Sequence, residues 1–187
     1  MLLRLSSSYG ICFLMCQAFN VKKVLRLFIR RLFILGLFAS FFTAPSLAYT
    51  DTKRLMIFGD SLVAGYGLPA EEGFTGQLQT RFEDEAMAIE VINAGVSGDT
   101  SAGGLARLDW SLAEKPDYIL VVLGGNDLLR GINPADTRQN LDQILARLEA
   151  LGVQTFLAGM LAPVNLGAEY GAEFNPIYPE LAEKYNT

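Results

Sequence analysis

Three short apolar segments of this chain each end in a glycine-containing loop with a polar side chain, and this pattern most restricts the possible folds. The segments are residues 55–58, 89–94 and 118–123, and a fourth apolar segment covers 154–158. Consecutive apolar residues over such lengths are typical of strands buried on both faces of a parallel sheet. Helical patterns separate the four segments, so the order predicts an α/β fold with a parallel sheet and right-handed crossovers.

The segments between the predicted strands have the composition of amphipathic helices. In the first of them, Leu78 and Phe82 lie four residues apart among polar side chains. The second helix has three suitable N-cap residues at its start, namely Asp99, Thr100 and Ser101. Together the patterns predict helices over residues 74–85, 101–112, 133–151 and 175–181.

Charge divides the 187 residues into two unequal parts. Residues 1–48 contain six Lys or Arg and no Asp or Glu, whereas residues 49–187 contain nine Lys or Arg and twenty Asp or Glu, a net charge of 9 − 20 = −11. So acidic a domain is poorly suited to bind nucleic acid or an anionic membrane through bulk electrostatics. Both cysteines, Cys12 and Cys16, lie in the first part, so we expect no disulfide in the second.

The first part has the pattern of a secretory signal peptide. Basic residues between 22 and 31 precede an apolar run of eleven residues at 32–42, and Ser46-Leu47-Ala48 has the small residues that a signal peptidase recognises. A membrane anchor is the alternative, but eleven residues at about 1.5 Å each span only about half of a ~30 Å hydrocarbon core. We therefore expect cleavage after Ala48, a periplasmic or secreted domain at 49–187, and no stable membrane anchor.

The three loops after the strands carry groups suited to ester hydrolysis. This reaction needs a nucleophile, a base and hydrogen-bond donors for the oxyanion. Ser61 offers a hydroxyl, Gly98 offers a backbone N–H beside a helix start, and Asn126 offers a side-chain amide. Each residue also has a purely structural interpretation, because serine and asparagine organise turns and glycine adopts positive φ. The loops become a candidate site only if they converge at one edge of the sheet.

These loops resemble the first three sequence blocks of the GDSL, or SGNH, hydrolase family. The resemblance rests on Gly59-Asp60-Ser61-Leu62, on Gly98 within residues 97–101, and on Gly124-Gly125-Asn126-Asp127, with flanks most similar to the bacterial periplasmic branch of thioesterase, lysophospholipase and arylesterase enzymes. It implies a flavodoxin-like three-layer α/β/α sandwich, Ser61 as nucleophile, and an oxyanion hole built from Ser61, Gly98 and Asn126. It also implies a small acyl ester or lipid substrate, a monomeric full-length enzyme, and neither a cofactor nor a metal. Residues 161–174 resemble the loop that borders the acyl site in this branch.

One family motif has no counterpart here. In the family, the base and its orienting carboxylate come from an Asp-x-x-His motif near the C-terminus, but this sequence contains no histidine. Residues 177–185 resemble the helix before the family's fifth strand, so we expect a chain without the last strand, the motif and the last helix. Asp60 and Asp127 belong to the motif loops, and an unperturbed carboxylate with a pKa near 4 is poorly matched to deprotonating a serine.

The sequence therefore leaves three interpretations open. The first is a serine esterase or thioesterase cut short as a gene fragment or by a premature stop, with little or no activity in the chain as given. The second is a non-catalytic module that binds an acyl group or a glycan. The third is a carbohydrate O-acetyl esterase on the same scaffold. Without the fifth strand, the fourth strand is expected to be an unpaired edge that favours aggregation.

Overall fold

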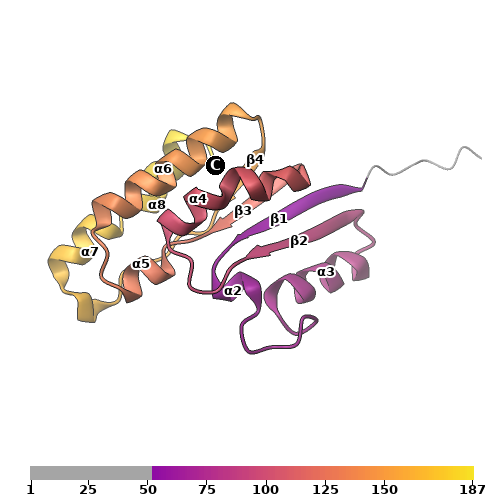
Figure 1. Cartoon of the computed structure of the whole chain (residues 1–187), viewed down its shortest axis with the longest axis horizontal. Coiled ribbons are helices and arrows are strands. Elements are labelled where there is room, and N and C mark those ends of the chain that lie inside the picture. The colour runs from indigo at the N-terminus through magenta and orange to yellow at the C-terminus, as the bar shows by residue number, and fades with distance from the viewer. Residues whose placement is uncertain (1–51) are drawn as a thin grey trace, which may run out of the picture. The chain divides into compact units, whose positions relative to one another are not determined.

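The computed structural model describes residues 52–187, and in this range four strands form one parallel sheet. The strands lie in the order β2-β1-β3-β4 (Figure 1). Their bounds are β1 Lys53–Gly59, β2 Ile89–Gly95, β3 Tyr118–Val122 and β4 Gln154–Leu157. Because β1 lies inside the sheet, the chain first builds outward on one side and then on the other. This is the topology of doubly wound folds, so the predicted α/β class is confirmed.

Helices lie between the strands and after the last of them. They are α2 Ser61–Ala64, α3 Phe74–Asp84, α4 Ser101–Ser111, α5 Gly125–Leu129, α6 Pro134–Ala150, α7 Ala168–Phe174 and α8 Ile177–Lys184, with 3₁₀ turns η1 Leu112–Glu114 and η2 Val164–Leu166. The four predicted helices correspond to α3, α4, α6 and α8, although α8 extends three residues beyond its predicted end. The sequence patterns did not predict α2, α5 and α7, because segments of four to seven residues are too short to show a helical period.

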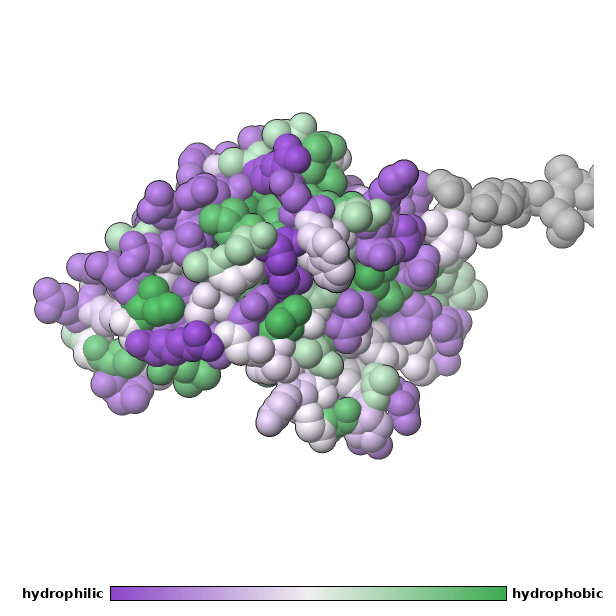
Figure 2. Space-filling model, viewed as in Figure 1, coloured by the Kyte–Doolittle hydropathy of each residue, from purple (hydrophilic) through white to green (hydrophobic). Residues whose placement is uncertain are grey.

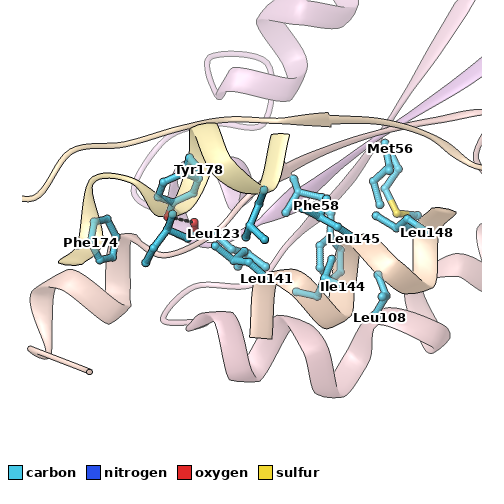
Figure 3. Packing of buried hydrophobic residues seen from close by; sticks show 14 of the residues in the cluster. Met56, Phe58, Leu108, Leu123, Leu141, Ile144, Leu145, Leu148, Phe174 and Tyr178 are labelled. Atoms are coloured by element: carbon cyan, nitrogen blue, oxygen red, sulfur yellow. Dashed lines mark hydrogen bonds between the residues drawn. The ribbon is translucent and has the colours of Figure 1, made fainter. Parts of the chain in front are cut away.

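The main core lies between one face of the sheet and the helices α4, α6 and α8 (Figure 3). On the sheet, Met56 and Phe58 are fully buried and point to this face. Ile57, between them in the strand, is equally buried but lies outside this cluster, because successive strand residues face opposite ways. The helices supply apolar residues at helical spacing, namely Leu108, Leu141, Ile144, Leu145, Leu148, Ile177 and Leu181.

Side-chain caps fix where the helices on this face begin. Of the three candidates for α4, Thr100 is the N-cap, and its hydroxyl accepts a hydrogen bond from the Gly103 N–H at 3.2 Å. Asn133 caps α6 in the same way, accepting from the Ala135 N–H at 2.9 Å, and Pro134 occupies the first turn. The face of the molecule shown in Figure 2 is mostly hydrophilic with apolar residues interspersed.

The two end strands of the sheet differ in how their outer edges are covered. On β2, the Gln79 side chain accepts from the Val91 N–H at 2.8 Å and donates to the Ile89 carbonyl at 3.3 Å, so it takes the place of a neighbouring strand. On β4, the Thr187 hydroxyl donates to the Thr155 carbonyl, but Phe156 remains 48% exposed. Within residues 52–187, β4 is thus an edge strand as expected, and its tendency to aggregate stays a prediction.

The predictions for the leader lie outside the described residues. These are the basic region, the apolar run, the cleavage after Ala48 and the two cysteines. Within residues 52–187, no helix is both long enough and apolar enough to cross a bilayer.

Candidate active site

The three motif loops leave the sheet from one level, at the carboxyl ends of β1, β2 and β3. Gly59, the last residue of β1, pairs with Gly95 on β2 and with Val122 on β3. Ser61, Gly98 and Asn126 follow these three paired residues by two, three and four positions. The topological switch point, where the order in which strands are added reverses, lies between β1 and β3. Doubly wound sheets bind their ligands at this point. The loops therefore converge at one edge of the sheet, as the candidate site requires.

Ser61 is the first residue of the short helix α2 and is half-buried. The preceding residue, Asp60, is buried and caps this helix, its Oδ1 accepting from the Leu62 N–H at 3.0 Å. Asp60 thus organises the loop, and its carboxylate is already occupied. Among residues 52–187, no protein group forms a hydrogen bond with the Ser61 hydroxyl, so none of them is placed to act as its base.

A single side-chain amide joins the three loops. Asn126 is the second residue of α5, and its Nδ2 donates to the Asp99 carbonyl at 2.8 Å and to Asp60 Oδ2 at 3.3 Å. Asp60 adjoins Ser61 in the chain, and Asp99 adjoins Gly98. The Asn126 amide therefore contacts the chain neighbour of each of the other two candidate residues. An amide nitrogen carries only two protons, and both are engaged here.

Gly98 is exposed and has a φ of +86°, in the left-handed region that other residues adopt only with strain. Its carbonyl accepts a hydrogen bond from Arg130 Nη2 at 2.7 Å. With the bond from Asn126 to the next carbonyl, two successive carbonyls of this loop are held by side chains of α5 and its C-cap. The loop conformation is thus set by contacts as well as by the glycine.

Arg107 in α4 also organises the site, and sequence reasoning did not identify it. Its Nε contacts Asp99 Oδ2 at 2.6 Å, and its Nη2 donates to the Gly59 carbonyl at 2.9 Å. The guanidinium also lies over the Phe58 ring, 4.2 Å from the ring centroid. Arg107 therefore ties the end of β1 to the Gly98 loop. The only sequence feature that could have indicated this role is its position on a predicted helix, two turns after Asp99. Its partners on β1 are 48 and 49 residues away in the sequence.

Asp127, the other carboxylate of the motif loops, is fully buried in a hydrogen-bond network that joins three helices. It accepts from the Ser101 N–H at 2.8 Å, from the Ser101 hydroxyl at 2.5 Å and from the Thr137 hydroxyl at 3.1 Å. Asn140 donates in turn to the Ser101 hydroxyl at 3.0 Å. Asp127 thus anchors the starts of α4 and α6 to α5, a structural role.

Replacing Asp127 with alanine is expected to lower the free energy of unfolding by at least about 3 kcal/mol. The substitution leaves three buried donors without an acceptor, and each costs about 1–3 kcal/mol. Urea denaturation of the variant measures the loss. Asp84→Ala is the matched control, since Asp84 is an exposed carboxylate at the end of α3 and should change stability by less than about 0.5 kcal/mol. A loss below about 1 kcal/mol for Asp127→Ala would contradict the network.

The third motif loop begins with a glycine that a tyrosine contacts closely. Gly124 has a φ of +111°, and a Cβ at this position would lie 2.1 Å from the Tyr178 hydroxyl oxygen. That hydroxyl donates to the Leu123 carbonyl at 2.8 Å (Figure 3). Burial, reinforced by the negative charge of Asp127, raises the pKa of the Tyr178 phenol. Tyr178 therefore stays protonated near neutral pH and is no substitute for a histidine base.

The segment expected to border the acyl site forms a separate hollow. A cavity of about 450 Å³ is lined by residues between Ala162 and Pro176, and none of them belongs to the three motif loops. The Asn175 side chain holds this segment by accepting from the Ala162 N–H at 2.8 Å. Within residues 52–187, no group of three or more metal-ligating side chains is placed to hold a metal ion.

Comparison with known proteins places this arrangement in a family. Residues 57–187, which include all three motif loops, match the GDSL-like lipase/acylhydrolase family. The chain belongs to this family. The resemblance seen in the motifs is therefore confirmed, and so is the class of enzyme that it implied.

Individual relatives agree with the family. Esterase TesA of Pseudomonas aeruginosa is 43% identical over 136 residues, which are 72% of this chain and 68% of that protein. The thioesterase 1/protease 1/lysophospholipase L1 of Escherichia coli is 41% identical over 140 residues, which are 74% of this chain and 65% of the Escherichia coli protein. Among solved structures, the SGNH-hydrolase family esterase AlinE4 superposes with a TM-score of 0.71 at 48% identity, covering 73% of this chain and 74% of that one. The relatives are thus esterases and a thioesterase, and the chain spans about two thirds of the two whose organisms are given.

Proposed function

We propose that this domain is a serine esterase or thioesterase site in which Ser61 attacks an acyl ester. The observation that carries the proposal is the position of Asn126, whose amide contacts the residues next to Ser61 and next to Gly98. In this mechanism a base takes the Ser61 hydroxyl proton, the Ser61 oxygen bonds to the ester carbonyl carbon, and the carbonyl oxygen becomes an oxyanion. The backbone N–H groups of Ser61 and Gly98 and the Asn126 amide donate to it. The bond from the carbonyl carbon to the leaving alcohol or thiol then breaks, the leaving group takes the proton, and water hydrolyses the acyl-serine.

The resting hydrogen bonds of Asn126 set a condition on this mechanism. Because both amide protons are engaged, one bond must lengthen or be shared before the amide can donate to an oxyanion. The bond to Asp60 is the longer one, at 3.3 Å against 2.8 Å for the bond to Asp99. We assign the Asp60-facing proton to the oxyanion, while the bond to Asp99 keeps the amide oriented.

The 187-residue chain lacks the base that this mechanism needs. It contains no histidine, and no described group bonds to the Ser61 hydroxyl. Little or no esterase activity is the expected result for the 187 residues alone. The same observation favours a second candidate function, a non-catalytic module that binds an acyl group or a glycan through this site.

Chemical rescue with imidazole distinguishes the two functions. A small diffusible base can enter beside Ser61 and accept its proton if the oxyanion donors are in place. Hydrolysis of p-nitrophenyl butyrate by the purified chain should rise with imidazole concentration. Ser61→Ala, measured at each concentration, gives the background hydrolysis by imidazole itself. A rate equal to that background throughout would favour the binding module.

The proposal extends to the substrate and the location of the domain. The names of the relatives support acyl esters, thioesters and lysophospholipids as substrates. Residues 1–48 act as the leader and the catalytic domain is 49–187, exported to the periplasm or secreted after cleavage at Ala48. N-terminal sequencing of the exported protein should begin at Tyr49.

A further inference from the structure

Arg130 is the one arginine among residues 52–187 that forms no ion pair. The six arginines of this range lie in a domain where acidic side chains greatly outnumber basic ones. Five of them contact a carboxylate within 4.0 Å, namely Arg54, Arg81, Arg107, Arg138 and Arg147. Arg130 bonds only to the Gly98 carbonyl, at 2.7 Å. A guanidinium has five N–H donors, so most of its donors face solvent.

The position of Arg130 places its charge beside the candidate oxyanion donors. It is the C-cap of α5, one turn after Asn126, and its guanidinium reaches across to the Gly98 loop. A Cβ built on Gly98 would lie 3.6 Å from Arg130 Nη2, so the two residues are in direct proximity. An exposed, unpaired guanidinium in this position favours an anionic group, because its fork of donors matches phosphate and carboxylate oxygens.

Apolar side chains accompany this charge in the same loops. Leu62, directly after Ser61, is 69% exposed, and Leu129, directly before Arg130, is 85% exposed. Singly exposed leucines are ordinary, but here Leu62 directly follows Ser61 and Leu129 directly precedes Arg130 in the chain. A ligand that contacts all of them needs an apolar chain and an anionic group a short distance apart.

We propose that Arg130 binds a phosphate or carboxylate group of the substrate and makes this site selective for anionic acyl amphiphiles. The inference rests on the proposed function, since it takes Ser61, Gly98 and Asn126 as the reacting centre. The net charge of −11 over residues 49–187 repels anions at long range, so the selectivity has to arise from a local contact. It should weaken as salt concentration rises.

Binding rather than turnover tests this proposal, so its outcome does not depend on a base. Isothermal titration of the purified chain uses dodecyl phosphate, laurate and dodecyl maltoside below their aggregation concentrations. Arg130→Gln should weaken the affinity for dodecyl phosphate about tenfold and change the affinity for dodecyl maltoside by less than about twofold. Arg130→Lys keeps the charge but loses the fork of donors, so its affinity for dodecyl phosphate should lie between those of the unmodified chain and Arg130→Gln. Arg138→Gln removes an arginine that is paired with Glu180 and should change neither affinity.

The laurate titration distinguishes the two anionic groups, because a larger effect of Arg130→Gln on one ligand assigns the site to that group. Three results would overturn the proposal. Arg130→Gln could weaken the affinity for dodecyl maltoside as much as that for the anions, it could leave the affinity for both anions unchanged, or the unmodified chain could bind none of the ligands. If imidazole rescue fails while the Arg130 effect is present, the esterase mechanism fails and the anion site stands.

Discussion

An extended chain, made by adding to the C-terminus a segment with the Asp-x-x-His motif of the family, should hydrolyse p-nitrophenyl acyl esters at least about 10⁴-fold faster than the 187 residues alone. The physical reason is that a serine hydroxyl is a poor nucleophile until a base accepts its proton, and loss of the base or of its orienting carboxylate costs about this factor in other serine hydrolases. The 187 residues contain no histidine, and burial keeps the Tyr178 phenol protonated. Initial rates of the two purified proteins at equal concentration provide the comparison.

Two controls make this comparison specific. The extended chain with alanine in place of its added histidine should return to the rate of the 187 residues, which separates catalysis from any improvement in folding. The extended chain with Ser61→Ala should be as slow. If the 187 residues alone showed robust turnover that depended on Ser61, the inactivity of the chain as given would be refuted, and a different base would have to be found.

Asn126→Ala in the extended chain is expected to lower kcat by about 10²–10³-fold with a much smaller change in KM. An oxyanion donor stabilises charge that develops only in the transition state, so its loss affects kcat rather than substrate binding. The effect should be larger than a loss of loop order alone would give, because Arg107 still ties the Gly98 loop to β1 through its contacts with Asp99 and Gly59. Steady-state kinetics with p-nitrophenyl butyrate measure both parameters.

Asn133→Ala is the matched control for this variant. Asn133 also bonds through its side chain, but that side chain caps α6 by accepting from the Ala135 N–H and forms no hydrogen bond with Ser61, Gly98 or Asn126. Its replacement should cost about 1 kcal/mol of stability and leave kcat unchanged. An Asn126→Ala variant with kcat within about threefold of the parent would exclude Asn126 as an oxyanion donor.

Local patterns were sufficient to predict the sheet and the three loops that meet at its edge. Each buried strand and the glycine after it are adjacent in sequence, and parallel strands necessarily bring their carboxyl ends to one edge. The motif loops therefore converge wherever this topology forms, which is why Ser61, Gly98 and Asn126 were identified together. Helix starts were predicted less exactly, since Asp99, Thr100 and Ser101 are chemically similar caps and only the geometry selects Thr100.

Contacts between distant residues were beyond the reach of sequence patterns. Arg107 and Arg130 resemble any solvated helix cation in the sequence, and apart from Asp99 their partners lie 32 to 49 residues away. The covering of the β2 edge by Gln79 is likewise a tertiary contact. Both Asn126 amide protons are engaged because two other loops place the Asp60 Oδ2 and the Asp99 carbonyl oxygen beside them. No pattern of residue types in the sequence specifies these positions.

The central claim is that Ser61, Gly98 and Asn126 share one oxyanion pocket, and a crystal structure of the extended chain after reaction with a fluorophosphonate tests it most directly. The phosphonyl group should be bonded to Ser61 Oγ, with its free oxygen about 3 Å from the Gly98 N–H nitrogen and from Asn126 Nδ2. The Asn126–Asp60 bond should be lengthened and the Asn126–Asp99 bond kept. A phosphonyl oxygen turned to solvent, with Asn126 more than about 8 Å away where contact near 3 Å is required, would contradict the account.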